Sequence, residues 1–154
     1  MNGYERLLVE TEINEIIVIE KYFKSKAKGL CKNNKIGISK RLQSISEKTC
    51  VLAEELGHYY TTIGDILDQS KIDNRKQERK ARAWGYEKLV PINSLIQASK
   101  ERVKNRHELA KYLNVTEKFL IDALKYYAEK YGPFYKFDNH VVYFEPLYVL
   151  KLLE

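Results

Sequence analysis

Residues 54–58 read Glu-Glu-Leu-Gly-His, and this spacing could place metal ligands and a catalytic carboxylate on one helix. Side chains four residues apart on a helix point the same way, so Glu54 and His58 could converge on one ion. Glu55 points about 100° further round, where its carboxylate could take a proton from a water molecule on that ion. The pattern is that of an H-E-x-x-H metal-binding helix in which Glu54 replaces the first histidine. A solvated acidic pair followed by a surface histidine is the alternative.

The residues around this motif predict a helix over about 47–61. Ser44 and Glu47 have the spacing of a capping box, which marks a helix start. A small or apolar stripe follows at helical spacing, formed by Cys50, Ala53, Gly57 and Tyr60. Glu54 and His58 border this stripe, so we expect both side chains to be partly buried.

The segment from Asn74 to Pro91 predicts a second helix, which begins at a favourable N-cap residue and ends before the proline. One face contains, at helical spacing, Glu78, Ala81, Arg82, Gly85 and Leu89. The small residues Ala81 and Gly85 would allow close packing against another helix. Glu78 is the candidate third ligand, because sites of this kind use a carboxylate together with histidine. The alternative is an amphipathic helix with Glu78 in solvent.

Together the two segments resemble the ImmA/IrrE family of metallopeptidases. The resemblance rests on residues 50–60, CVLAEELGHYY, and 78–91, ERKARAWGYEKLVP. The corresponding family patterns are H-E-x-G-H and E-x-x-A-N-x-F-A…L-x-P. The stretch 27–39 also resembles the strand hairpin that precedes the metal helix in that family, and the whole resemblance covers roughly residues 4–130.

The resemblance implies a role for each candidate residue. His58 and Glu78 would be metal ligands, Glu55 the catalytic carboxylate, and Glu54 an atypical ligand in place of histidine. Arg82 stands where the family usually has asparagine.

The glutamate at position 54 has consequences for the chemistry. Two glutamates and one histidine cancel the charge of a divalent ion. The pKa of a water molecule on that ion is then higher than the value of about 7 in good zinc sites, because less positive charge acts on the water. Zinc is the metal that the family resemblance implies. Because carboxylates favour harder ions, manganese and iron are the alternatives. The sequence therefore leaves three outcomes open: a slow enzyme, an enzyme with another metal, or an inactive relative.

The order of elements predicts an α+β fold, a zincin-like domain over 1–95 followed by a helical extension over 96–154. The elements expected before the metal helix are a helix over 4–14, a strand over 15–23, and a hairpin of strands over 29–32 and 35–39. Residues 63–70 are expected to form a loop or a short helix.

Residues 105–131 predict a helix, a tight turn and a second helix capped by Thr116, the shape of a DNA-binding helix-turn-helix. An alternating aromatic stretch over 134–144 predicts a β-hairpin that would resemble a wing. Two acids near the start of the second helix, Glu117 and Asp122, would face phosphate in a DNA complex. DNA contact therefore stays open beside structural packing or partner docking.

Composition and charge narrow the setting. No apolar run approaches the roughly 18 residues of a membrane span, and the charged N-terminus is not a signal peptide. Cys31 and Cys50 are the two cysteines of the sequence, and we expect thiols in a cytoplasmic protein. The net charge of +6 comes with interleaved acids, so solvated helix faces explain most of it. His107 and His140 are expected at the surface or as capping residues.

The family resemblance implies a cytoplasmic protein of a prophage or mobile element that cleaves a helix-turn-helix repressor. The alternative is a catalytically weak or inactive relative that binds a repressor or DNA through residues 100–145. Metal content distinguishes the two, because a binding module needs no ion between Glu54, His58 and Glu78.

Overall fold

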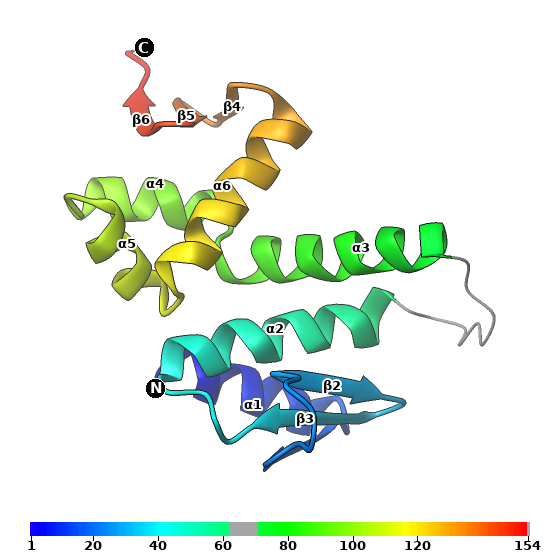
Figure 1. Ribbon diagram of the computed structural model, residues 1–154. Coiled ribbons are helices and arrows are strands. Elements are labelled where there is room, and N and C mark those ends of the chain that lie inside the picture. Colours follow the sequence, from blue (N-terminus) through cyan, green and yellow to red (C-terminus); the bar gives the residue numbers. More distant parts are fainter. Residues whose placement is uncertain (62–70, 154) are drawn as a thin grey trace. The chain divides into compact units, whose positions relative to one another are not determined.

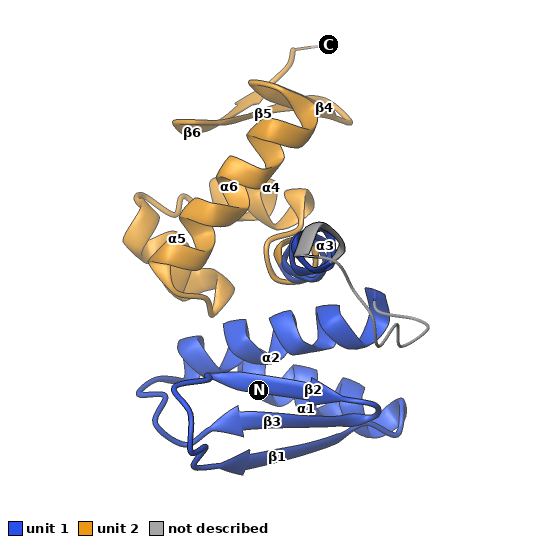
Figure 2. Cartoon of the chain, turned by 45° about the vertical axis from the view of Figure 1, so that its right-hand side comes forward, with its two compact units in different colours: residues 1–85 blue, residues 86–154 orange. Residues whose placement is uncertain are grey.

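The computed structural model describes residues 1–61 and 71–153 and has a mixed α+β fold, as the sequence predicts (Figure 1). The chain divides into two units, 1–85 and 86–154 (Figure 2). The boundary between the units follows Gly85 and falls inside helix α3 (Lys71–Leu89). The sequence predicts that the first domain ends later, at residue 95. A division into domains at 95/96 stays a prediction.

The first unit combines a small sheet with helices. Its elements are α1 (Gly3–Ile13), β1 (Ile17–Lys21), β2 (Gly29–Lys32), β3 (Lys35–Ser39), α2 (Ile45–Thr61) and the larger part of α3 (Lys71–Leu89). The strand order is β1-β3-β2, with β1 and β3 parallel and β2 and β3 antiparallel. Helices α1 and α2 pack against each other and against the sheet. The hairpin strands have the bounds that the sequence predicts.

The two faces of this sheet differ in burial. Ile36 and Ile38 of β3 are buried, and Cys31 and Gly29 pair with them, so all four lie on the face that α2 covers. Leu30 of β2 lies on the opposite face, because strand residues alternate between faces, and its side chain is 54% exposed. The sheet is therefore covered by helices on one face only within the described residues.

The second unit also combines helices with a sheet. Its elements after α3 are α4 (Ile92–Lys100), α5 (Arg106–Leu113), α6 (Glu117–Tyr131), β4 (Phe134–Phe137), β5 (His140–Phe144) and β6 (Leu147–Lys151). The strands form an antiparallel sheet in the order β4-β5-β6. The buried Tyr127 hydroxyl donates a hydrogen bond of 2.8 Å to the carbonyl of Val90.

Over 105–131 the chain forms helix α5, a short turn and helix α6. Asn114 ends α5 in the left-handed conformation, with φ of 60°. The Thr116 hydroxyl accepts a hydrogen bond of 3.1 Å from the backbone N–H of Phe119, so Thr116 caps α6 as predicted. The hairpin expected over 134–144 is also present, as β4 and β5, but a third strand, β6, extends it.

Some boundaries differ from the predicted ones. α3 begins at Lys71, before the expected start at Asn74. The first strand covers Ile17–Lys21 and is shorter than the expected 15–23 at both ends; it starts later because Glu15 has a positive φ of 59° that interrupts extended backbone. The prediction for residues 63–70 lies outside the described residues. No helix in the described part of the chain is long and apolar enough to cross a membrane.

Candidate metal centre

Helix α2 carries three of the four candidate site residues, and its start is fixed by local hydrogen bonds. The Ser44 hydroxyl accepts a hydrogen bond of 3.1 Å from the backbone N–H of Glu47. The Glu47 carboxylate accepts one of 3.4 Å from the backbone N–H of Gln43. The first bond is that of the predicted capping box, and the second differs from it because the Glu47 carboxylate bonds the residue before Ser44. The buried side of α2 then contains Thr49, Cys50, Leu52, Ala53, Leu56 and Gly57.

A glycine brings α3 close to α2. A Cβ atom at Gly57 would overlap the backbone carbonyl of the fully buried Ala81 and lie 2.9 Å from its Cα, so no larger residue fits there. One turn along, a Cβ at Gly85 would lie 3.6 Å from Ala53, which is ordinary contact. The small residues of α3 therefore allow the close packing that the sequence predicts. Of the two glycines, only Gly57 leaves no room for a Cβ atom.

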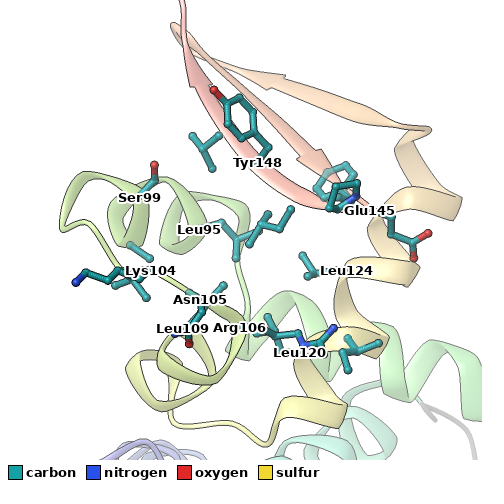
Figure 3. Close-up of a pocket in the computed structure, with 17 residues that line it drawn as sticks. Leu95, Ser99, Lys104, Asn105, Arg106, Leu109, Leu120, Leu124, Glu145 and Tyr148 are labelled. Atoms are coloured by element: carbon teal, nitrogen blue, oxygen red, sulfur yellow. The ribbon is translucent and has the colours of Figure 1, made fainter.

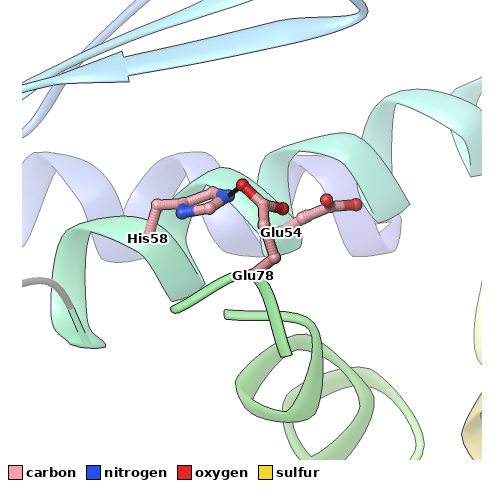
Figure 4. Close-up of side chains that lie close together, drawn as sticks. All are labelled: Glu54, His58 and Glu78. Atoms are coloured by element: carbon pink, nitrogen blue, oxygen red, sulfur yellow. Dashed lines mark ion pairs between the residues drawn. The ribbon is translucent and has the colours of Figure 1, made fainter. Parts of the chain in front are cut away.

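This close approach brings Glu78 of α3 beside His58 of α2 (Figure 4). The Nε2 atom of His58 lies 3.4 Å from Oε1 of Glu78. Ligand atoms of Glu54, His58 and Glu78 all lie within 4.8 Å of one another. Two ligands about 2.1 Å from a tetrahedral ion lie about 3.4 Å apart, so the donor types and the spacing fit a divalent metal. The convergence matches the expectation, and the metal-binding role stays a prediction.

Glu55 lies on the side of α2 that faces the sheet. Burial is the largest cause that raises the pKa of the Glu55 carboxyl, and together with the nearby carboxylates of Glu54 and Glu78 it brings this pKa to about 7. A Cβ atom at Gly29 would lie 2.9 Å from Cγ of Glu55, so β2 passes directly over this side chain. A general base works best with a pKa near the working pH, which this environment provides.

A cavity of about 840 Å³ opens beside these residues. Its lining comes from α2, α3 and the β2–β3 hairpin, and contains Gly29, Leu30, Cys31, Lys32, Asn33, Glu55, His58, Tyr59, Asn74, Gln77 and Glu78. The carboxylate proposed as the base and two of the three candidate ligands thus face one space that is wide enough for a peptide segment.

Arg82 is a residue whose contribution the sequence analysis missed. Its Nε atom lies 3.7 Å from Oε1 of Glu54, with side chains that are 55% and 38% exposed. Glu54 and Arg82 are the two positions where the chain departs from the family pattern by gaining a charge, and they neighbour each other across α2 and α3. The sequence contained a signal for this ion pair, because the two residues that depart from the family pattern, Glu54 and Arg82, carry opposite charges.

The other two histidines lie in the second unit and do not join a metal-ligand group among the described residues. His107 is exposed, and its Nδ1 atom lies 2.7 Å from Oε1 of Glu117. His140 is buried on β5, with 8% of its surface exposed, so the expectation that it lies at the surface is wrong. The alternation of β5 explains this, because Val142 and Phe144 share its buried face.

Comparison with models of known protein families identifies a match that covers most of the chain. The model of the IrrE N-terminal-like domain, of the M78 peptidases, matches residues 9–125, which are most of the chain. No curated protein matches the chain.

Proposed function

Because the chain belongs to the M78 peptidase family, to which ImmA/IrrE proteins belong, we propose that it is a metal-dependent endopeptidase. The observation that carries the proposal is the convergence of Glu54, His58 and Glu78 beside the half-buried carboxylate of Glu55. These four residues come from two helices that a glycine allows to touch, and Glu55, His58 and Glu78 line a cavity of peptide size.

Glu54, His58 and Glu78 are proposed to hold the metal. Bound there, a divalent ion would polarise the scissile carbonyl and make a water molecule more acidic. Zinc is the proposed ion because imidazole and carboxylate are ligands that it accepts. Manganese or iron are the alternatives, because two carboxylates among three ligands favour harder ions.

Glu55 is proposed as the general base and then the general acid. It takes a proton from the attacking water and delivers that proton to the amine that leaves when the peptide bond breaks. Its partial burial beneath β2 and the neighbouring carboxylates of Glu54 and Glu78 hold its pKa near neutrality. The side chain can therefore be ionised when it accepts the proton and protonated when it donates it.

The proposed substrate is a helix-turn-helix repressor, in the cytoplasm of a cell that carries a prophage or mobile element. This part of the proposal rests on the family resemblance. The cavity adds one requirement: an edge strand, β2, forms one of its walls, and such a strand pairs with extended backbone. The cleaved segment must therefore be a loop or linker of the repressor rather than one of its helices.

The second candidate function is a non-catalytic module that binds a repressor or DNA through the second unit. The helix–turn–helix formed by α5 and α6 favours it. The start of α6 is poorly suited to DNA, because Glu117 pairs with His107 and the Nζ atom of Lys118 lies 2.7 Å from Asp122.

A cavity of about 620 Å³ in the same unit favours a protein segment over DNA (Figure 3). It lies among α4, α5, α6 and the β5–β6 turn, and its apolar lining includes Leu95, Leu109, Leu120, Leu124, Phe144 and Leu147. Apolar side chains offer nothing to phosphate groups, whereas they suit the apolar side of a protein segment.

The test compares Glu55→Gln with the parent protein. Each is incubated with zinc or manganese and the repressor encoded beside it, and the products are measured by intact-mass analysis. Glutamine keeps the size of the side chain but cannot accept the proton, so we expect cleavage to slow by about 10²-fold or more. Glu12→Gln, an exposed change on α1, is the control and should cleave at the parent rate. Metal-independent fragments, or equal rates for parent and Glu55→Gln, would contradict the proposal.

A further inference from the structure

The positive charge of the chain is concentrated in residues 21–41 of the first unit, which include strands β2 and β3 and the loops around them. No acidic residue occurs between Glu20 and Glu47, whereas this stretch contains Lys21, Lys24, Lys26, Lys28, Lys32, Lys35, Lys40 and Arg41. All eight side chains are exposed. The other nineteen basic residues are outnumbered by the twenty-one acidic residues, so this stretch accounts for the net charge of +6. The interleaved acids expected to offset the basic clusters are missing here.

Part of this charge lies on β2, which is an edge strand. Within the described residues, β3 is the single strand that pairs with β2. The Lys28 carbonyl accepts a hydrogen bond of 2.8 Å from the backbone N–H of Ser39, toward β3. Backbone groups alternate in direction along a strand, so those of Gly29 and Cys31 point toward the open edge. Both residues line the cavity that contains Glu55.

The side chains of β2 also separate into two rows. Gly29 and Cys31 lie on the face toward α2, with the candidate site. Leu30 and Lys32 of β2 alternate with them, and with Lys28, which directly precedes the strand and is hydrogen-bonded to Ser39, they form the edge row on the opposite, exposed face. A peptide strand added beside β2 would place every second side chain next to this edge row, at the distance of a cross-strand pair.

We propose that the cavity selects an extended peptide segment with an acidic–x–apolar–x–acidic pattern, docked as an added strand on β2. Its two acidic side chains would lie next to Lys28 and Lys32, and its apolar side chain next to Leu30. The intervening residues would face α2 and the carboxylates of Glu55 and Glu78. The inference rests on the proposed function, because it assigns the peptide to the cavity of the candidate peptidase site.

A nucleic acid fits this surface less well than an acidic peptide. Phosphates repeat along a nucleic acid strand, so they would meet the exposed apolar side chain of Leu30 and the carboxylates of Glu55 and Glu78 as well as the lysines. An extended peptide avoids this conflict, since alternate side chains point to opposite faces and can carry different charges.

The test measures binding, so it does not depend on turnover. Fluorescent peptides that carry Glu-x-Leu-x-Glu, Gln-x-Leu-x-Gln or Lys-x-Leu-x-Lys are titrated with the Glu55→Gln protein, and anisotropy is recorded. We expect the acidic peptide to bind about tenfold more tightly than the glutamine peptide, from two favourable cross-strand charge pairs. In the Lys28→Glu/Lys32→Glu variant the preference should invert, and the lysine peptide should bind most tightly.

Lys21→Glu is the matched control, because Lys21 is exposed on β1 at the opposite edge of the same sheet. Two strand spacings, about 10 Å, separate the edges, so screening should limit its effect to about twofold. Equal binding of the three peptides would overturn the inference. So would a Lys21→Glu effect as large as that of the double variant, or a single-stranded DNA oligonucleotide that binds more tightly than the acidic peptide and displaces it.

The outcomes for the two proposals are separable. Repressor cleavage that depends on metal and Glu55, together with no preference among the peptides, overturns the substrate inference and leaves the peptidase intact. Preference for the acidic peptide in a protein that never cleaves upholds the docking surface and overturns the proposed activity.

Discussion

Two side-chain pairs join α2 to α3, and they differ in what they offer a metal. The first pair, His58 and Glu78, matches the family pattern, lines the cavity beside Glu55, and has donor atoms 3.4 Å apart. The second pair, Glu54 and Arg82, departs from the pattern at both positions and has charged atoms 3.7 Å apart. His58 and Glu78 are both candidate metal ligands, with a spacing that suits one ion. In the other pair only Glu54 is a candidate ligand, and the guanidinium of Arg82 would compete with the ion for its carboxylate.

The difference shows that the replacement of the first histidine should not be considered alone. By itself, Glu54 would cancel the positive charge that a divalent ion keeps beside two histidines and one glutamate. Arg82 returns one positive charge at the same place, so the Glu54–Arg82 pair has no net charge, like the His–Asn pair that it replaces. Both side chains are more than one-third exposed, so solvent screens part of this compensation.

The largest effect is expected from a change that separates both pairs at once. Gly57→Ala would force α3 away from α2, because its Cβ overlaps the Ala81 carbonyl. We expect a loss of about 3 kcal/mol in the free energy of unfolding, as for severe overpacking, and zinc affinity at least about tenfold lower. Urea denaturation and zinc titration measure the two effects.

Gly85→Ala is the matched control on the other helix. The added Cβ meets its nearest neighbours at 3.6 Å, and alanine is the better helix former by about 1 kcal/mol. This variant should be as stable as the parent or more so, with unchanged zinc affinity. Equal losses from the two substitutions would mean that the close approach at Gly57 does not hold the site together.

A smaller effect is expected when the Glu54–Arg82 pair is changed to the histidine and asparagine of the family pattern. Glu54→His should tighten zinc binding by about tenfold, since imidazole is a better zinc ligand than carboxylate. Arg82→Asn should change zinc affinity differently in the two backgrounds, because Arg82 has a carboxylate partner in one and none in the other. Zinc titration of the four proteins should give a coupling energy of about 0.5 kcal/mol or more.

Additive effects in this cycle would show that Arg82 does not act through Glu54. If Glu54→His binds zinc no better than the parent, position 54 does not face the metal. The Glu54–Arg82 pair then has no part in metal binding.

Much of the site could be predicted because its signals are local. The Ser44–Glu47 capping box fixes where α2 starts, and the spacing of Glu54 and His58 fixes their common face. The small residues of α3 indicated a close helix contact, which is what brings Glu78 to His58. Each of these inferences needs only helical geometry and the sizes of the side chains.

The features that the sequence did not reveal depend on partners far apart in the chain. Arg82 was noted only as a departure from a pattern, because its proximity to Glu54 depends on how two helices face each other. The strand β6 and the burial of His140 depend in the same way on a sheet that β4, β5 and β6 form together.

The most direct test of the central claim is elemental analysis of protein purified without a metal-affinity tag. The parent and the His58→Ala variant are each loaded with zinc or manganese, freed of unbound ion, and measured for metal per chain. The account predicts about one ion per chain in the parent and a small fraction of that in His58→Ala, because the imidazole is one of three ligands. A parent that retains no ion, or a variant that retains as much as the parent, would contradict it.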